Sequence, residues 1–286
     1  MRATLLCAAI LMLTVYTTAG IAFAQEWREA KGSHFIIYYL EGDDSFAKEV
    51  LRQAEKYYVR IAHDLGYTRY QNFWVWDKRV KIYIYSDRTT FQEATSAPEW
   101  AAGIAQYEKK KIISYVRSED FLDSLLPHEM THLMFRDFVG FKGEIPLWLD
   151  EGVAQWAELE KRKLAKVKVE EFAQSQQLLP LTTMMRTKAY QITNPDGLYI
   201  RPSLREPEQG VMFLTGSALL ELFYLQSVSI VDFLIEKYGT KKFTTFCRNL
   251  RDAKTLNEAL SSTYRLKDIQ ELEEEWSKYI RTQKAD

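Results

Sequence analysis

Five consecutive residues near the middle of the chain, His128-Glu129-Met130-Thr131-His132, have the types and spacing needed to hold a metal ion and activate water. In a helix, positions i and i+4 lie on one face, so His128 and His132 can both present a ring nitrogen to one Zn²⁺. Glu129 lies one step around the helix, where it can take a proton from a metal-bound water and pass it to a leaving amine. The spacing therefore predicts one zinc ion per chain, with Glu129 as general base and acid.

The residues around this motif favour a metal-binding helix over a solvated helix that carries two histidines by chance. Leu125-Leu126-Pro127 precede the motif and Leu133-Met134-Phe135 follow it, and Glu129 is the only charged residue between Ser124 and Phe135. A lone glutamate in an apolar helix is costly unless it has a partner, and a metal-bound water is a suitable partner.

A catalytic zinc site keeps three protein ligands and one open position, so a third ligand is required. The position six residues after His132 is Phe138, which cannot bind the metal. The remaining histidines lie upstream and the cysteines are poorly placed; these residues are His34, His63, Cys7 and Cys247. The third ligand is therefore expected to be a carboxylate.

The best-placed carboxylate is Glu151, 19 residues after His132 in the segment PLWLDEGVA that begins at Pro146. This separation lets the first helix end, the chain turn, and a second helix return antiparallel, with Pro146 near its start. The alternative is that Glu151 is a solvated carboxylate favoured by the helix dipole, a role that Asp150 would serve equally well. Glu151 is preferred because it shares a helix face with Ala154 and Gln155.

The sequence HEMTH followed by PLWLDEGVAQW resembles the gluzincin metallopeptidases, and most of all the compact bacterial peptidase MA-like domains, which carry HExxH and then W-L-x-E-G-x-A. The similarity continues through residues 224–229 into 233–239 and covers about residues 34–280. The resemblance implies zinc at His128, His132 and Glu151. It also implies that Glu129 is the general base and acid.

The resemblance further implies a donor that stabilises the oxyanion of the reaction. Thermolysin uses a downstream histidine, but no histidine follows His132 here. The aminopeptidase N group uses a tyrosine, and Tyr224 matches it best in position, although a core tyrosine is the alternative. The same group anchors a free N-terminus with a G-A-M-E-N-like segment. The corresponding residues 101–108 are AAGIAQYE, so the similarity does not extend to aminopeptidase specificity. Gln155 or Asp150 is expected to orient a ligand histidine.

Residues 1–24 have the pattern of a signal peptide. Arg2 precedes an apolar run from Leu5 to Val15 that is too short to span a bilayer, and Ala22-Phe23-Ala24 offers a cleavage site. We expect an exported protein, periplasmic or secreted, whose mature chain starts near Gln25; an uncleaved anchor is the alternative. One cysteine then remains, which excludes an internal disulfide. We also expect no further apolar run of about 18 residues, and so a mature chain that does not span a membrane.

The composition indicates an ordinary globular protein. The net charge is −1 with interspersed signs, which gives no indication of nucleic-acid binding, and the basic runs at 109–111 and 161–163 are expected to be solvated. Aromatic residues make up 14% of the chain, which supports a well-buried core. About 260 mature residues allow one domain, 25–286, built as one unit or two closely packed lobes.

The fold class expected is α+β, with a small mixed sheet, then the HExxH helix and a mainly helical C-terminal lobe, as in thermolysin-like zincins. Residues 25–140 would form the sheet lobe and metal helix, and residues 141–286 the helical lobe. Strands are predicted at 33–40 and 80–85, and a hairpin at 103–107 and 112–116. The hairpin either pairs with an extended substrate or is purely structural. Helices are predicted at 43–66, 89–95, 121–139, 147–163, 169–177, 213–238, 241–251, 256–264 and 268–281.

Two C-terminal regions allow two interpretations each. The segment 187–210 is rich in proline and is either a lid over the cleft or a mobile connector. The last 40 residues either brace the metal helices or dock a partner, and their apolar residues at helical spacing favour bracing.

These observations predict an exported metallopeptidase that hydrolyses peptide or protein substrates with a zinc-bound water activated by Glu129. Two other functions remain open. One is a non-catalytic zinc-binding scaffold of the cell envelope. A missing general base would have indicated such a scaffold, but Glu129 is present. The other is a zinc hydrolase of a non-protein amide. Zinc is expected over other divalent metals from the ligand types. The sequence does not specify the substrate, endo- or exo-cleavage, or the oligomeric state.

Overall fold

The structure is a computed structural model that describes residues 26–67, 73–97, 101–116, 118, 120–141, 144–188, 191, 198–200, 212–214 and 216–282. The predicted signal segment and most of the predicted loop at 187–210 lie outside these residues.

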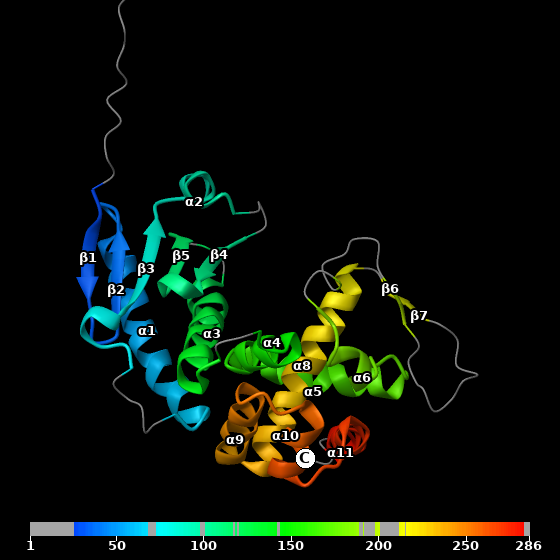
Figure 1. The fold of residues 1–286 in the computed structure, drawn as a ribbon. Helices are drawn as coiled ribbons and strands as arrows, with labels where there is room; N and C mark the ends of the chain where they lie inside the picture. Colours follow the sequence, from blue (N-terminus) through cyan, green and yellow to red (C-terminus); the bar gives the residue numbers. More distant parts are fainter. Residues whose placement is uncertain are drawn as a thin grey trace, which may run out of the picture.

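A five-stranded mixed sheet forms the N-terminal part of the molecule, in the order β1-β2-β3-β5-β4 (Figure 1). The central strands β2, β3 and β5 are parallel, and the two edge strands run antiparallel to their neighbours. The small mixed sheet expected from the sequence is confirmed, except that β1 was not predicted because its residues, REAK, are mostly charged and exposed. The strands are β1 (Arg28–Lys31), β2 (Phe35–Tyr39), β3 (Val80–Tyr85), β4 (Gly103–Gln106) and β5 (Lys111–Tyr115).

Alternation along the strands gives the sheet one buried face. Every second residue of β2 and β3 is buried, beginning with Phe35 and Val80. Helix α1 (Asp44–Asp64) packs on this face with an apolar stripe that includes Val50 and Ile61. The period of two in the strands and of 3.6 in the helix explains why these residues meet in one core.

Helices make up the rest of the described chain. In Figure 1 the sheet, α1 and α3 lie at one end of the molecule, and the helices from α4 onward gather at the other. Helix α8 runs through this second group and packs along α4. The remaining helices are α2 (Arg88–Thr95), α3 (Leu126–Val139), α4 (Leu147–Trp156), α5 (Leu159–Gln174), α6 (Leu181–Met184), α8 (Gly216–Tyr238), α9 (Thr240–Arg251), α10 (Leu256–Tyr264) and α11 (Ile269–Thr282).

Two predicted helices are divided in the structure. The helix expected at 147–163 ends at Trp156, and a new helix begins at Leu159, because Glu158 adopts an extended backbone conformation. The metal helix expected at 121–139 begins with a π-helical turn, Phe121–Leu125, before α3 starts. Pro127 lies in the first turn of α3, where its missing N–H breaks no helical hydrogen bond.

The prediction for residues 187–238 is corrected in three places. Leu198–Ile200 is a strand, β6, that pairs antiparallel with Met212–Leu214, β7, so part of the expected loop is regular. Helix α8 therefore starts at Gly216 instead of 213. The expectation of no further long apolar run is also wrong, since α8 is long and apolar enough to cross a membrane by composition alone. Most of it is buried in the protein, as in a core helix.

Candidate metal centre

Helix α3 presents His128 and His132 from one face. Their Nε2 atoms lie 3.1 Å apart, with the two rings nearly perpendicular. Burial of α3 against the sheet and α1 is extensive, and His132 itself is 3% exposed. The i, i+4 spacing thus produces the pair of ring nitrogens that the sequence predicted.

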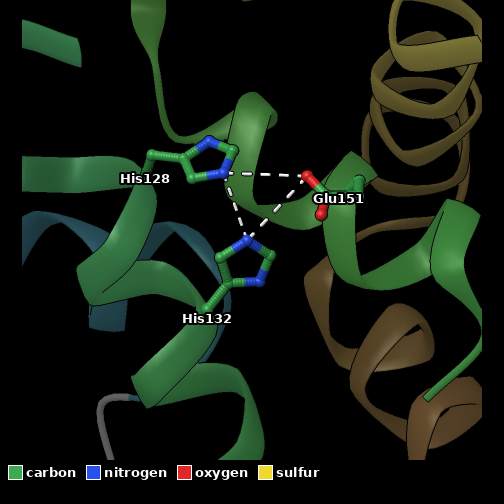
Figure 2. A group of neighbouring side chains, drawn as sticks. All are labelled: His128, His132 and Glu151. Atoms are coloured by element: carbon green, nitrogen blue, oxygen red, sulfur yellow. Dashed lines mark hydrogen bonds and ion pairs between the residues drawn. The ribbon is translucent and has the colours of Figure 1, made fainter. Parts of the chain in front are cut away.

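Helix α4 brings Glu151 to the same point from the opposite side (Figure 2). Its Oε2 atom lies 3.7 Å from Nε2 of His128 and 3.9 Å from Nε2 of His132. One nitrogen or oxygen from each residue lies within 4.8 Å of the others. Ligands bonded to a tetrahedral zinc at about 2.0–2.2 Å are separated by roughly 3.3–3.6 Å, so the three residues are positioned to bind such an ion.

The position of Glu151 depends on the glycine that follows it. A Cβ atom added at Gly152 would lie 2.6 Å from the backbone oxygen of Ser227 on α8 and 2.9 Å from its carbonyl carbon. Only glycine allows α4 and α8 to approach this closely. Gly152 therefore fixes the distance of α4 from α8, and with it the placement of the third ligand.

A buried carboxylate accepts a hydrogen bond from the second nitrogen of each histidine. Asp150 Oδ1 lies 2.9 Å from Nδ1 of His132, and Arg136 donates to the other oxygen of Asp150 at 3.3 Å. Glu158 Oε1 lies 2.8 Å from Nδ1 of His128. A hydrogen on each Nδ1 leaves both Nε2 lone pairs free for a metal.

Glu158 is a residue of the candidate centre that the sequence reasoning missed. It is 2% exposed and also accepts hydrogen bonds from Ser124 and from Lys161, the latter at 3.0 Å. Of the two partners proposed for a ligand histidine, Asp150 has that contact, whereas the described residues show no hydrogen bond from Gln155 to either histidine. No spacing rule connects positions 128 and 158, and the helix predicted at 147–163 runs through Glu158, so no sequence signal indicated this contact.

Burial and charge perturb every ionisable group of the centre. Burial raises the pKa of Glu129 and of Glu151 and lowers the pKa of His128. Burial also lowers the pKa of His132, but Asp150 and then the nearby glutamates outweigh it and raise this pKa to about 9. Burial alone would raise the pKa of Asp150, but the interaction with His132 outweighs burial, so the pKa of Asp150 is lowered.

The charge balance of the centre favours a bound cation. Four carboxylates, from Glu129, Asp150, Glu151 and Glu158, lie around two imidazoles in a poorly hydrated region. Arg136 pairs with Asp150 and Lys161 pairs with Glu158, which leaves the charges of Glu129 and Glu151 to be balanced. Buried carboxylates require a compensating charge. The donor set, its spacing and this excess of negative charge together suit Zn²⁺.

Two tyrosines lie beside the metal ligands. Burial is the main reason that the pKa of Tyr224, from α8, is raised, and the charges of Glu151 and Glu129 add to it. The pKa of Tyr107 is raised by burial and by Glu129, Asp150 and Glu151. The ring of Tyr107 meets His132 edge-on at 5.8 Å, and the guanidinium of Arg136 lies 4.6 Å from its centre. Tyr107 immediately follows the edge strand β4 and was not predicted as a site residue.

Comparison with known proteins gives a family and a set of similar solved structures. The family model described as Peptidase MA superfamily matches residues 55–195 and 209–282 and supports a zinc metallopeptidase-type function. A comparison with curated proteins found no match. The structure of yeast LTA4 hydrolase in complex with bestatin is similar with a TM-score of 0.45 and 12% identity. That alignment covers 86% of this chain and 38% of the hydrolase, so the chain spans much less than the length of that protein.

Proposed function

Because the chain belongs to the Peptidase MA superfamily, we propose that it is a zinc-dependent metallopeptidase that hydrolyses peptide bonds in peptides or proteins. The observation that carries this proposal is the convergence of His128, His132 and Glu151, with Glu129 next to the first histidine. A zinc ion bound there would polarise the scissile carbonyl and make an attacking water more acidic.

The residues around the ion would have separate roles. Glu129 would accept the proton of the attacking water and deliver it to the leaving nitrogen. The Tyr224 phenol, close enough to Glu151 and Glu129 for their charges to raise its pKa, would donate a hydrogen bond to the developing oxyanion. Asp150 and Glu158 would keep the two imidazoles oriented through their Nδ1 atoms.

Export forms a second part of the proposal. The charged start, apolar run and Ala22-Phe23-Ala24 sequence support cleavage after residue 24 and a periplasmic or secreted enzyme. Expression of the whole chain in a bacterium, followed by fractionation and intact-mass measurement, tests this. A periplasmic or secreted product that begins near Gln25 supports export, whereas an unprocessed product in the cytoplasm contradicts it.

Zinc content and hydrolysis of an unstructured protein such as casein test the enzymatic proposal. Three proteins are compared: the wild type, Glu129→Gln and Glu160→Gln. Glu160 is a suitable control because its side chain is exposed and pairs only with Lys163 among the described residues. We expect about one zinc per chain in all three proteins, and casein hydrolysis that is lost only in Glu129→Gln.

Three outcomes contradict the proposal in different ways. A wild type that holds no zinc after incubation with the metal contradicts the assigned ligands. Zinc in all three proteins without hydrolysis of casein or of a broad peptide library supports the scaffold function. Hydrolysis of cell-wall amides, but not of peptides, would show that the protein is a zinc hydrolase of a non-protein amide.

A further inference from the structure

The face of the sheet that points away from α1 carries aromatic and basic side chains. Tyr38 and Tyr83, on neighbouring strands, stack with ring centres 4.6 Å apart. Trp27 packs edge-on against Tyr83 at 5.3 Å, and Nζ of Lys111 lies 4.1 Å from the centre of the Tyr83 ring. We call this set, with Lys81 on β3, the outer face.

The lysines at one end of the outer face repel one another. Lys81 and Lys111 are register partners on β3 and β5, and Lys109 lies in the turn before β5. Burial lowers the pKa of Lys111, and the charges of Lys109 and Lys81 lower it further. Within the described parts of the chain, no carboxylate makes a salt bridge to any of the three. The group therefore has positive charge that an anionic partner would balance.

An exposed tryptophan lies at the same end of the sheet. Trp76 is 82% exposed and has a positive φ of 60°, which is unfavourable for a residue with a large side chain. Arg79 holds the backbone there by donating to the carbonyls of Trp76 at 2.8 Å and of Gly32 at 3.2 Å. Since β3 begins at Val80, this turn lies beside the end of the sheet that carries the lysines. The backbone of this turn is therefore held in place while the indole of Trp76 is open to solvent.

We propose that Trp76 and the lysines Lys81, Lys109 and Lys111 dock the protein on an anionic lipid bilayer. Tryptophan and tyrosine favour the headgroup region, where one end of the ring is in apolar surroundings and the other is hydrated. Lysines near the surface are attracted to anionic lipids. Glu29, Asp77 and Glu108 lie among these residues. Lys31 pairs with Glu29, and Lys78 and Arg79 add two further cations, so positive charge is in excess.

The surface lies close to the candidate metal centre in the fold. Lys109 belongs to the same short turn as Tyr107, whose ring contacts His132. Docking would therefore hold the metal centre near the bilayer. The inference does not depend on the peptidase activity.

Vesicle co-sedimentation at low salt tests the proposal. The probes are vesicles of phosphatidylglycerol and phosphatidylcholine in equal parts, and vesicles of phosphatidylcholine alone. The variants are Trp76→Ala and the triple variant Lys81→Gln, Lys109→Gln, Lys111→Gln. The matched controls are Val167→Ala, an exposed apolar residue on α5, and the triple variant Lys163→Gln, Lys168→Gln, Lys241→Gln. All proteins are prepared with the same N-terminus, checked by mass spectrometry, and circular dichroism verifies folding.

We expect the wild type to bind the anionic vesicles at least tenfold more tightly than the neutral ones. The outer-face lysine variant should bind roughly 100-fold more weakly, Trp76→Ala about tenfold more weakly, and the controls like the wild type. Equal binding to both vesicles, or equal loss in the matched lysine variants, overturns the proposal. Self-association that Trp76→Ala abolishes would also overturn the proposal, because the surface would then bind a second copy of the chain. Binding to soluble polyglutamate without binding to vesicles would overturn it too, because the partner would then be an acidic polypeptide.

Discussion

The Nδ1 atom of His128 lies 2.8 Å from Oε1 of Glu158, a residue 30 positions further along the chain. Glu158 is buried at the break between α4 and α5, and its own position is held by Ser124 and Lys161. The carboxylate thus links the metal helix to the start of α5. The break that divides a predicted helix is therefore also the feature that orients one imidazole of the candidate metal centre.

Replacement of Glu158 by glutamine should weaken zinc binding without removing it. The amide can still accept from Nδ1 but carries no charge, so the imidazole becomes a poorer ligand and less firmly oriented. Changes to such partners typically reduce metal affinity about 10- to 100-fold. Competition with a fluorescent zinc chelator measures the affinity, and Glu160→Gln is the control. Equal affinity in Glu158→Gln and wild type would show that the contact is only structural.

The two tyrosines beside the metal centre should respond differently to loss of their hydroxyl groups. Tyr224→Phe should lower kcat about 10²- to 10³-fold with little change in KM, because an oxyanion donor acts only in the transition state. Tyr107→Phe keeps the ring that contacts His132 and Arg136, so its kcat should change less than about threefold.

Steady-state kinetics on one peptide, with zinc content checked for each variant, separates the two tyrosines. The reverse result, a large loss in Tyr107→Phe and a small one in Tyr224→Phe, would transfer the donor role to Tyr107. Equal small losses would remove both residues from the chemistry.

Alanine at position 152 should destabilise the protein and weaken zinc binding together. Its methyl group would meet the backbone of Ser227, which cannot move as a side-chain end can. Such overpacking typically costs about 1–3 kcal/mol, and separation of α4 from α8 would displace Glu151. Urea unfolding and zinc titration measure the two effects.

Gly42→Ala is the comparison for this prediction. Gly42 has a φ of +95° and open space around it, so its substitution strains the backbone without a packing clash. It lies between β2 and α1, which carry none of the candidate ligands. We expect Gly42→Ala to lower stability with unchanged zinc affinity. If Gly152→Ala also keeps its zinc affinity, the close approach of α4 and α8 does not position Glu151.

Local spacing explains what the sequence predicted well. The i, i+4 relation places His128 and His132 on one face of any helix, and a second helix after a short turn brings Glu151 back to them. The alternating strand at 80–85 was predicted with its observed bounds for the same reason.

The missed features depend on contacts between distant residues. Glu158 leaves the helical conformation where it meets His128 and Ser124, residues that no local pattern connects to it. Strand β1 has a charged sequence and exists because it pairs with β2. Likewise β6 forms by pairing with β7 across a segment that looked like a loop. In each case tertiary pairing outweighs the local preference.

The acid sensitivity of one surface ion-pair network can be predicted with its sign. Glu275 on α11 lies 2.5 Å from Nζ of Lys237 on α8 and 2.7 Å from Nζ of Lys278. Hydrogen bonds from Lys237 and then Lys278 lower the pKa of Glu275 to about 2, from an ordinary value of 4.5. A depressed pKa means that the folded state favours the ionised carboxylate. This stabilisation is present above pH 4.5 and is lost as the pH falls towards 2.

Glu275→Gln should therefore lower the free energy of unfolding at pH 7 by roughly 0.5 kcal/mol, since all three side chains are partly exposed and screened. The difference from the wild type should shrink as the pH falls below 4.5, because the carboxyl of the unfolded wild-type chain then takes up a proton while the folded state keeps its carboxylate ionised until about pH 2. Urea unfolding at several values between pH 7 and pH 3 measures it. Glu236→Gln is the control, because Glu236 is exposed on α8 and makes no salt bridge within the described residues. If the loss of unfolding free energy in Glu275→Gln stays constant down to pH 3, the residue acts through packing and not through its charge.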